Sequence, residues 1–362
     1  MHDTGRIILD IPPCEGNPRN SEGAFITLPD GRMVFIFSTF RGGDAADHAP
    51  ASLARIESSD GGETWSDVQI NLTAEGDEAQ NIMSVSLLPM LDGSIGLFYF
   101  IRRGYEDSKE HLRKSWDGGL TWSEPVACVP AQGYYVTNND RVIRLQSGRL
   151  VVPAGFHRSV FDRRTGRQTW DSRCISLYCY SDDDGKTWAE SNPCTLNVRS
   201  YYAGLQEPGV IELANGALYG WARTDAGVQY EMFSLDCGES WSVPEPSRFT
   251  GPNSPLSMKR NPATGNLIAI WNPIPNYITR PVTSSAWNGS RTPLVSSVSG
   301  DEGKTWSEPV VIEDDPTAGY CYTAMHFNGD DLLLAYCAGG SGDGSCLNRL
   351  RIRKIPVGLL DP

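Results

Sequence analysis

The eight residues SSDGGETW, at Ser58–Trp65, recur with small changes along this chain of 362 residues. The other copies are SWDGGLTW at Ser115–Trp122, SDDDGKTW at Ser181–Trp188, SLDCGESW at Ser234–Trp241 and SGDEGKTW at Ser299–Trp306. In each copy the aspartate can accept hydrogen bonds from backbone N–H groups of its own turn, a glycine supplies a positive φ, and the tryptophan packs beneath. Five copies of one turn predict five equivalent hairpin ends.

The spacing of the copies predicts the architecture. Successive aspartates of the motif are 57, 66, 53 and 65 residues apart, at Asp60, Asp117, Asp183, Asp236 and Asp301. A repeat of this length is typical of one supersecondary unit that is used many times.

A second pattern consists of two apolar, β-rich runs that meet at a tight turn, which is typical of β-hairpins. It occurs six times, at residues 26–37, 86–100, 142–154, 210–222, 258–272 and 325–337. No segment shows helical periodicity over twelve or more residues. We therefore expect an all-β fold, a six-bladed β-propeller of four-stranded antiparallel blades, formed by residues 1–362 as a single domain. A right-handed β-helix is the alternative, although its repeats are usually much shorter.

The sixth hairpin is not followed by the aspartate motif. We expect GRIILDIPP (5–13), near the N-terminus, and LNRLRIRKIPVG (347–358), near the C-terminus, to supply the remaining strands of the sixth blade and to close the ring.

Composition and charge exclude some classes of partner. The net charge of -13 argues against nucleic acid or an anionic membrane surface as a partner. No apolar run approaches the ~20 residues of a membrane span. The first residues lack the basic and apolar regions of a signal peptide, so we expect a cytoplasmic protein, with secretion left open for a trimmed chain. Nine scattered cysteines indicate reduced, mostly buried thiols.

The repeated motif, S-x-D-x-G-x-T-W, resembles the Asp box of the sialidase (neuraminidase) superfamily, and the resemblance covers nearly the whole chain. Asp boxes also occur in non-enzymatic propellers and in other glycosidases, so they indicate a fold more strongly than an activity. In the family the boxes lie on the outer rim, and the catalytic residues come from inner strands and the opposite loops. The resemblance implies no metal and no organic cofactor.

The resemblance implies two site residues before the first box. Arg41 and Asp47 lie 19 and 13 residues before Asp60, where the family has a pocket arginine and then the acid/base aspartate. A carboxyl group on a loop can close over a leaving group and protonate it. Asp44 competes with Asp47 for this role.

Later segments resemble the rest of the family's site. Glu207 and Arg223 match the catalytic glutamate and a carboxylate-binding arginine, with Glu212 as the rival acid. Arg291, ten residues before Asp301, matches a further arginine of the carboxylate clamp, whereas Arg260 is interpreted as a structural residue.

Tyr322 or Tyr320 matches the tyrosine nucleophile of the family. The anomeric carbon of a sialoside already bears a carboxylate, so a neutral phenol that Glu207 activates approaches it without the repulsion that an acid would meet.

One segment departs from the family pattern. The family's first arginine lies in an Arg-Ile-Pro motif, and that position falls here on Ser21 or Glu22, with Arg19 displaced by two or three residues. The Tyr-Glu pair of the last hairpin is replaced by Tyr336-Cys337. If Arg19 reaches the pocket, a modified carboxylate clamp remains. If Glu22 faces the pocket, the ligand differs from an ordinary sialoside.

The resemblance therefore implies a retaining exo-glycosidase that releases a terminal α-linked sialic acid or a related acidic sugar from a glycan or a small molecule. Two alternatives remain open: a propeller glycosidase that acts on a different sugar, and a carbohydrate-binding propeller without catalytic activity. The sequence does not indicate the oligomeric state.

Overall fold

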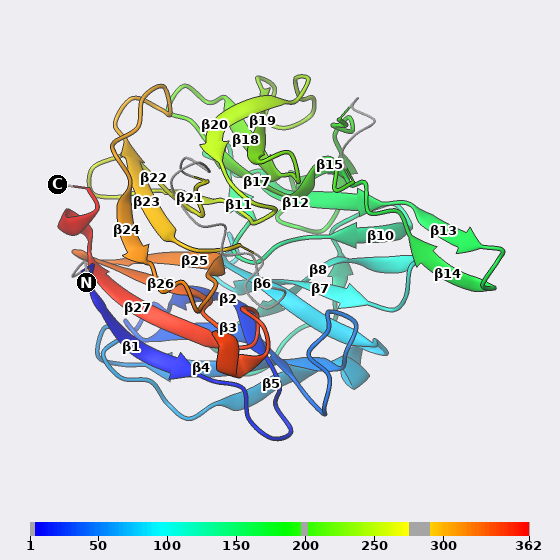
Figure 1. The fold of residues 1–362 in the computed structure, drawn as a ribbon, viewed down its shortest axis with the longest axis horizontal. Helices are drawn as coiled ribbons and strands as arrows, with labels where there is room; N and C mark the ends of the chain where they lie inside the picture. Colours follow the sequence, from blue (N-terminus) through cyan, green and yellow to red (C-terminus); the bar gives the residue numbers. More distant parts are fainter. Residues whose placement is uncertain (1–3, 197–201, 275–289, 362) are drawn as a thin grey trace.

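The computed structural model describes residues 4–196, 202–274 and 290–361, which form an all-β fold (Figure 1). Across these residues the only helices are three short 3-10 helices, η1 (Ala74–Asp77), η2 (Ser341–Asp343) and η3 (Val357–Leu359). The expected all-β class and the four-stranded antiparallel sheets are confirmed.

Three four-stranded antiparallel sheets follow the order of the chain. The first sheet contains β2 (Asn20–Thr27), β3 (Met33–Phe40), β4 (Ala51–Ser58) and β5 (Gln69–Thr73). The fourth contains β17 (Gln206–Glu212), β18 (Leu218–Arg223), β19 (Val228–Ser234) and β20 (Glu245–Thr250). The fifth contains β21 (Ser257–Arg260), β22 (Leu267–Trp271), β23 (Leu294–Ser299) and β24 (Val310–Glu313).

The second and third sheets are joined into one nine-stranded sheet. The second is β6 (Asn81–Pro89), β7 (Ile95–Arg102), β8 (Asp107–Ser115) and β9 (Val126–Ala127). The third is β11 (Ile143–Arg144), β12 (Leu150–His157), β15 (Ile175–Ser181) and β16 (Ala189–Glu190). β10 (Gly133–Val136) joins them, pairing parallel with β8 and antiparallel with β12. A separate hairpin, β13 (Ser159–Asp162) and β14 (Arg167–Trp170), projects from this side of the molecule (Figure 1).

The sixth sheet combines both ends of the chain. β25 (Cys321–Asn328), β26 (Asp331–Cys337) and β27 (Leu350–Pro356) are followed in the sheet by β1 (Arg6–Ile11), which pairs antiparallel with β27. The prediction that the terminal segments complete this sheet is confirmed.

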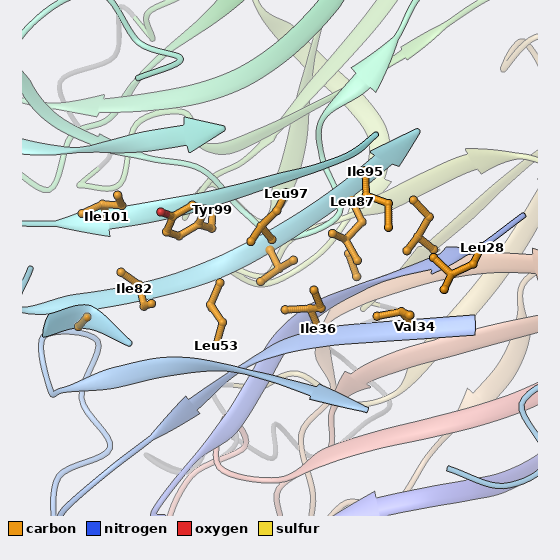
Figure 2. Packing of buried hydrophobic residues seen from close by; sticks show 14 residues of the cluster. Leu28, Val34, Ile36, Leu53, Ile82, Leu87, Ile95, Leu97, Tyr99 and Ile101 are labelled. Atoms are coloured by element: carbon orange, nitrogen blue, oxygen red, sulfur yellow. The ribbon is translucent and has the colours of Figure 1, made fainter. Parts of the chain in front are cut away.

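Strands of neighbouring sheets lie side by side. β2 contacts both β6 and β25, β17 contacts both β12 and β21, and β21 contacts β25. Apolar side chains fill the spaces between the sheets. Figure 2 shows one such core, in which Ile36 and Leu53 of the first sheet face Ile82, Leu97 and Tyr99 of the second.

The repeated turn connects the third and fourth strands of the first five sheets, and its aspartate is held locally. In the first copy the Thr64 backbone N–H and hydroxyl both donate to the Asp60 carboxylate, and the Ser58 hydroxyl donates to Asp60 Oδ1 over 2.8 Å. The same contacts recur around the other four aspartates, as in Ser115 to Asp117 and Ser181 to Asp183. The sixth sheet lacks the motif because its third and fourth strands, β27 and β1, come from opposite ends of the chain.

The inner strands carry a second repeated feature that the sequence does not display. β2, β6, β17 and β25 each contain a register shift, and one residue of each shift has a positive φ: Glu22, Ser84, Glu207 and Tyr322. A β-bulge redirects the side chain of the extra residue. A positive φ in a non-glycine residue is a strained conformation that clusters at functional sites. The four bulges bring their side chains to one place near the centre of the molecule.

Candidate active site

The four bulges share one pocket. Its wall contains all four bulge residues, the loop residue Asp47, and side chains from the second, third and fourth sheets. The lining residues are Glu22, Asp47, Met83, Ser84, Phe100, Arg102, Tyr134, Val136, Thr137, Asn138, His157, Trp170, Gln206, Glu207, Arg223 and Tyr322.

Tyr322 and Glu207 form a hydrogen-bonded pair in this pocket. The Tyr322 hydroxyl donates to Glu207 Oε1 over 2.9 Å, although the two residues are 115 positions apart in the chain. Arg223 completes the group: its Nη1 lies 2.9 Å from Glu207 Oε2 and 3.1 Å from the Tyr322 oxygen. Gln206 Oε1 fixes the other side of the guanidinium by accepting from Nε and Nη2.

The surroundings keep the phenol of Tyr322 protonated. Burial raises its pKa well above the ordinary range, and this effect outweighs the nearby charge of Arg223, which lowers the pKa. A buried neutral phenol becomes an effective nucleophile only if a base removes its proton during attack. Glu207 is within hydrogen-bond distance and is placed to be that base.

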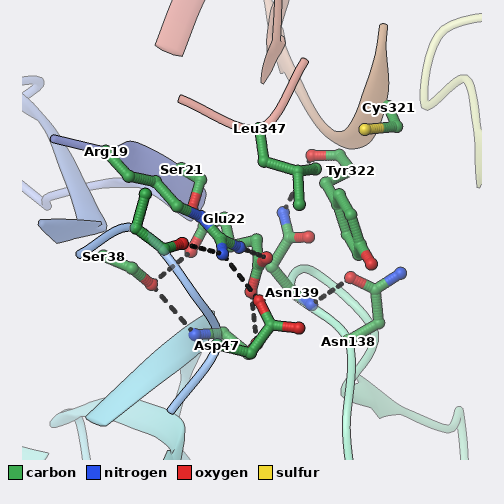
Figure 3. Close-up of polar contacts among 12 residues, drawn as sticks. Arg19, Ser21, Glu22, Ser38, Asp47, Asn138, Asn139, Cys321, Tyr322 and Leu347 are labelled. Carbon is green, nitrogen blue, oxygen red and sulfur yellow. Dashed lines mark hydrogen bonds and ion pairs between the residues drawn. The ribbon is translucent and has the colours of Figure 1, made fainter. Parts of the chain in front are cut away.

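A second cluster lies across the pocket around Arg19 (Figure 3). Arg19 is almost fully buried, with 1% of its side chain exposed, and it contacts two carboxylates. Its Nη2 donates to Glu22 Oε1 over 2.7 Å, and its Nη1 donates to Asp47 Oδ1 over 2.6 Å. The Ser84 hydroxyl donates to the other Glu22 oxygen over 2.6 Å. Of the two alternatives that the sequence left open, Glu22 lines the pocket, whereas Arg19 is buried behind Glu22 and Asp47 and is not a lining residue.

The two acids of this cluster differ in their protonation. Burial raises the pKa of Glu22 to about 7, and the charges of Asp47 and Glu207 add to this effect against the opposing charge of Arg19. Desolvation also acts on Asp47, but the charge and hydrogen bond of Arg19 prevail and lower its pKa. Asp47 is 66% exposed on its loop at the pocket mouth. A carboxylate in that position can reach a leaving group from the solvent side.

An aromatic wall faces the loop of Asp47. The Arg102 guanidinium donates to the Asp47 backbone oxygen over 3.4 Å and stacks 5.1 Å from the ring of Tyr134. Tyr134 in turn contacts Trp170 and His157. Burial lowers the pKa of His157 to about 4, so this imidazole is neutral at pH 7.

Four residues that the resemblance pointed to, Arg19 among them, lie outside the pocket lining. Arg41 is exposed and lines a separate surface pocket, and its backbone N–H donates to the Pro50 carbonyl. Tyr320 is buried against Tyr336, since the bulge gives the pocket position to Tyr322. These placements correct the expectations for Arg41 and Tyr320. Arg291 lies behind the site, with its guanidinium 5.4 Å from the centre of the Tyr322 ring.

Arg291 is held by contacts away from the pocket. Its Nη1 donates to Cys321 Sγ over 3.0 Å, and its Nη2 donates to the Asn253 carbonyl over 3.1 Å. Cys321, Cys337 and Cys346 form one buried cluster at this point. Cys337, which stands where the family has a glutamate, belongs to this cluster. Seven of the nine cysteines are buried, as predicted.

The rival residues occupy other places. Asp44 is exposed beside His48, Glu212 accepts the backbone N–H of Gln146, and Arg260 pairs with Glu302. The interpretation of Arg260 as structural agrees with this ion pair.

The sequence reasoning missed Ser84, Arg102, Tyr134, His157 and Trp170. Two signals were available. Arg102 ends the second strand of its hairpin, just as Arg41 follows that of the first. The 66-residue spacing between the second and third boxes has room for the β13–β14 hairpin, which ends at Trp170.

In the parts of the chain that the structure describes, no cluster of three or more His, Cys, Asp or Glu side chains could hold a metal ion. Nor does any described helix have the length and apolar character needed to cross a membrane.

The molecule thus combines an all-β fold of repeated sheets with a central pocket that contains a tyrosine–glutamate pair. The chain matches the model of the BNR repeat-like domain over residues 33–334, and it belongs to this family.

Two sialidases are similar over most of the chain. The Clostridium perfringens sialidase is 23% identical over 357 residues, which is 87% of this chain and 85% of that protein. The Paraclostridium sordellii sialidase is 27% identical over 362 residues, covering 87% and 80%. A Bacteroides fragilis sialidase is 24% identical over 318 residues, and the chain spans about half (53%) of its length.

Solved structures share the fold. A Dyadobacter fermentans protein of unknown function superposes with a TM-score of 0.71 at 17% identity, covering 97% of this chain and 99% of that one. The intramolecular trans-sialidase from Ruminococcus gnavus, in complex with oseltamivir carboxylate, gives a TM-score of 0.69 at 13% identity, covering 100% and 99%. These likenesses show that the fold is shared.

Proposed function

We propose that this chain is a retaining exo-glycosidase of the sialidase type, built as a six-bladed propeller, with Tyr322 as its nucleophile. The observation that carries the proposal is the 2.9 Å hydrogen bond from the Tyr322 hydroxyl to Glu207. The substrate class proposed from the family is a terminal α-linked sialic acid or a related acidic sugar. A propeller glycosidase that acts on a different sugar would use the same catalytic groups.

The proposed first step breaks the glycosidic bond. As the Tyr322 oxygen attacks the anomeric carbon, its proton passes to Glu207. Asp47 donates a proton to the departing glycosidic oxygen, so the aglycone leaves as a neutral alcohol. Because Arg19 lowers the pKa of Asp47, the protonated form that starts this step is the minor one near neutral pH. The sugar is then bound covalently to the tyrosine.

The proposed second step reverses these proton transfers. Asp47, now a carboxylate, accepts a proton from water, and the water oxygen attacks the anomeric carbon. The tyrosine oxygen leaves and recovers its proton from Glu207. Two displacements at one carbon retain the anomeric configuration. Arg223 contacts both Glu207 and the tyrosine oxygen, so it can stabilise the charge that each acquires.

The test is the release of 4-methylumbelliferone from its sialoside, measured beside a panel of neutral and uronic acid glycosides. Turnover of any member, with retained configuration of the released sugar by NMR, supports the proposed mechanism. Inactivity on the whole panel would contradict it and favour a carbohydrate-binding propeller.

A further inference from the structure

The cation at the back of the pocket is already neutralised by the protein. Every nitrogen of the Arg19 guanidinium has an acceptor: Nε donates to Ser21 over 3.0 Å, Nη1 to the Ala45 carbonyl and Asp47, and Nη2 to Glu22. The residue is 1% exposed. Four of the five N–H donors of Arg19 are thus used within the protein, and the side chain is buried, so Glu22 and Asp47 occupy the positions that a ligand carboxylate would need.

The group that faces the ligand on this side is Glu22 itself. It lines the pocket, is 3% exposed, and has one oxygen on Arg19 and the other on the Ser84 hydroxyl. Its strained backbone, with a φ of 52°, fixes this orientation. Each carboxylate oxygen can accept more than one hydrogen bond, so Glu22 can also accept from a ligand hydroxyl.

The other charges do not restore a carboxylate site on this wall. Three acids, Glu22, Asp47 and Glu207, line the pocket together with two arginines, Arg102 and Arg223. Arg223 is held by Glu207, Tyr322 and Gln206, as described above. Arg102 stacks on Tyr105 and Tyr134. Arg102 has no ion-pair partner among the described residues, but a ligand carboxylate placed beside Glu22 would face a like charge at this wall.

We propose that Glu22 determines the sugar specificity of this pocket: by occupying Arg19, it selects a sugar whose edge at this wall is uncharged and carries hydroxyl groups. This inference rests on the proposed glycosidase function. Between the substrate classes named above, it favours the alternative in which the glycosidase acts on a sugar other than sialic acid. The neutral sugar donates hydroxyl hydrogen bonds to Glu22, and the anomeric carbon lies at Tyr322 on the opposite side of the pocket.

The experiment compares kcat/KM of the full chain for matched 4-methylumbelliferyl glycosides with and without a carboxylate. The wild-type chain should prefer neutral glycosides over the sialoside and the uronic acid glycosides by at least about tenfold. Glu22→Gln keeps the shape and an oxygen for Arg19, while its amide nitrogen would donate to the Ser84 hydroxyl oxygen instead of accepting from it. The variant removes the charge, so it should lower this preference at least about tenfold. Asp67→Asn is the matched control: it removes one exposed charge from the first sheet outside the pocket, and it should leave the preference unchanged.

A wild-type preference for the sialoside would overturn the inference, and so would an equal preference in wild type and Glu22→Gln. Calorimetric binding of the free neutral and acidic sugars gives the same ratio without turnover. If no glycoside is turned over, the proposed function fails while the binding ratio still tests Glu22. Thermal unfolding shows whether Glu22→Gln folds. If the variant does not fold, the preference of the wild-type chain for neutral over acidic sugars decides the inference alone.

Discussion

The outer turns and the inner bulges of this molecule are both repeated, but in opposite ways. The five outer turns repeat their sequence as well as their geometry, and the acid of each turn is satisfied by its own backbone and by neighbouring hydroxyl groups. The inner bulges repeat only a backbone conformation, while their side chains are Glu22, Ser84, Glu207 and Tyr322. The difference teaches that the repeat with a constant sequence maintains the frame, whereas the repeat with varied side chains lines the pocket and carries the proposed chemistry.

The largest effect that this comparison predicts is at the bulge of β25. Tyr322→Phe removes the oxygen that would attack the anomeric carbon and should lower kcat at least ~10³-fold, because the displacement has no other nucleophile. Steady-state kinetics on the best glycoside of the panel would measure it. Tyr320→Phe, two residues away but outside the pocket, should leave kcat within a factor of about 3. Equal losses in the two variants would remove the distinction between pocket and core tyrosines.

The bulge of β17 should show the next largest effect. Glu207→Gln keeps the hydrogen bond to the Tyr322 hydroxyl possible but removes the base, so kcat should fall about 10²- to 10⁴-fold. Glu212→Gln, at the other end of the same strand, is the matched control and should leave kcat unchanged. A wild-type kcat in Glu207→Gln would show that the tyrosine does not require this carboxylate.

The two repeats also differ in how far the sequence could predict them. The outer turn is local, because eight consecutive residues contain every donor and acceptor that it needs. The all-β class and the order of the sheets along the chain could therefore be predicted from the sequence alone. The bulges need contacts between residues far apart, such as Tyr322 with Glu207, and their side chains share no pattern. The resemblance to a family was therefore required to select Asp47, Glu207, Arg223 and Tyr322.

The misplaced Arg41 and the overlooked Trp170 have the same physical origin, which is contact between residues that lie far apart in the sequence. Arg41 and Asp47 lie on one loop, and sequence distance does not indicate which of the two side chains lines the pocket. Asp47 does, held by its contact with the distant Arg19, whereas Arg41 lines a separate surface pocket. Trp170 reaches the pocket only because a hairpin packs against Tyr134. No periodicity of the chain encodes that contact.

A bulge acid should also make stability depend on pH, in the opposite direction to an outer acid. Burial raises the pKa of Glu22 from 4.5 to about 7, so the folded chain holds this proton more tightly than the unfolded chain. The stabilisation of the folded state that results is therefore fully present below about pH 4.5 and is lost as pH rises to about 7. This change in the free energy of unfolding is on the order of 3 kcal/mol. Glu22→Gln lacks this loss, so its free energy of unfolding should rise relative to wild type between pH 5 and pH 8 in urea titrations. Parallel pH curves for the two proteins would contradict the assignment.

The smallest effect should come from an outer turn, and it should affect stability alone. Ser181 is 2% exposed; its hydroxyl donates to Asp183 and accepts the backbone N–H of Gly185. Ser181→Ala leaves that N–H without its acceptor and should lower the free energy of unfolding by about 1 to 3 kcal/mol, read as a lower Tm. Because the turn connects β15 and β16 and contributes no residue to the pocket lining, kcat and KM should stay within a factor of about 2. A large loss of kcat at unchanged Tm would instead place chemistry in the repeated turn and reverse the contrast between rim and centre.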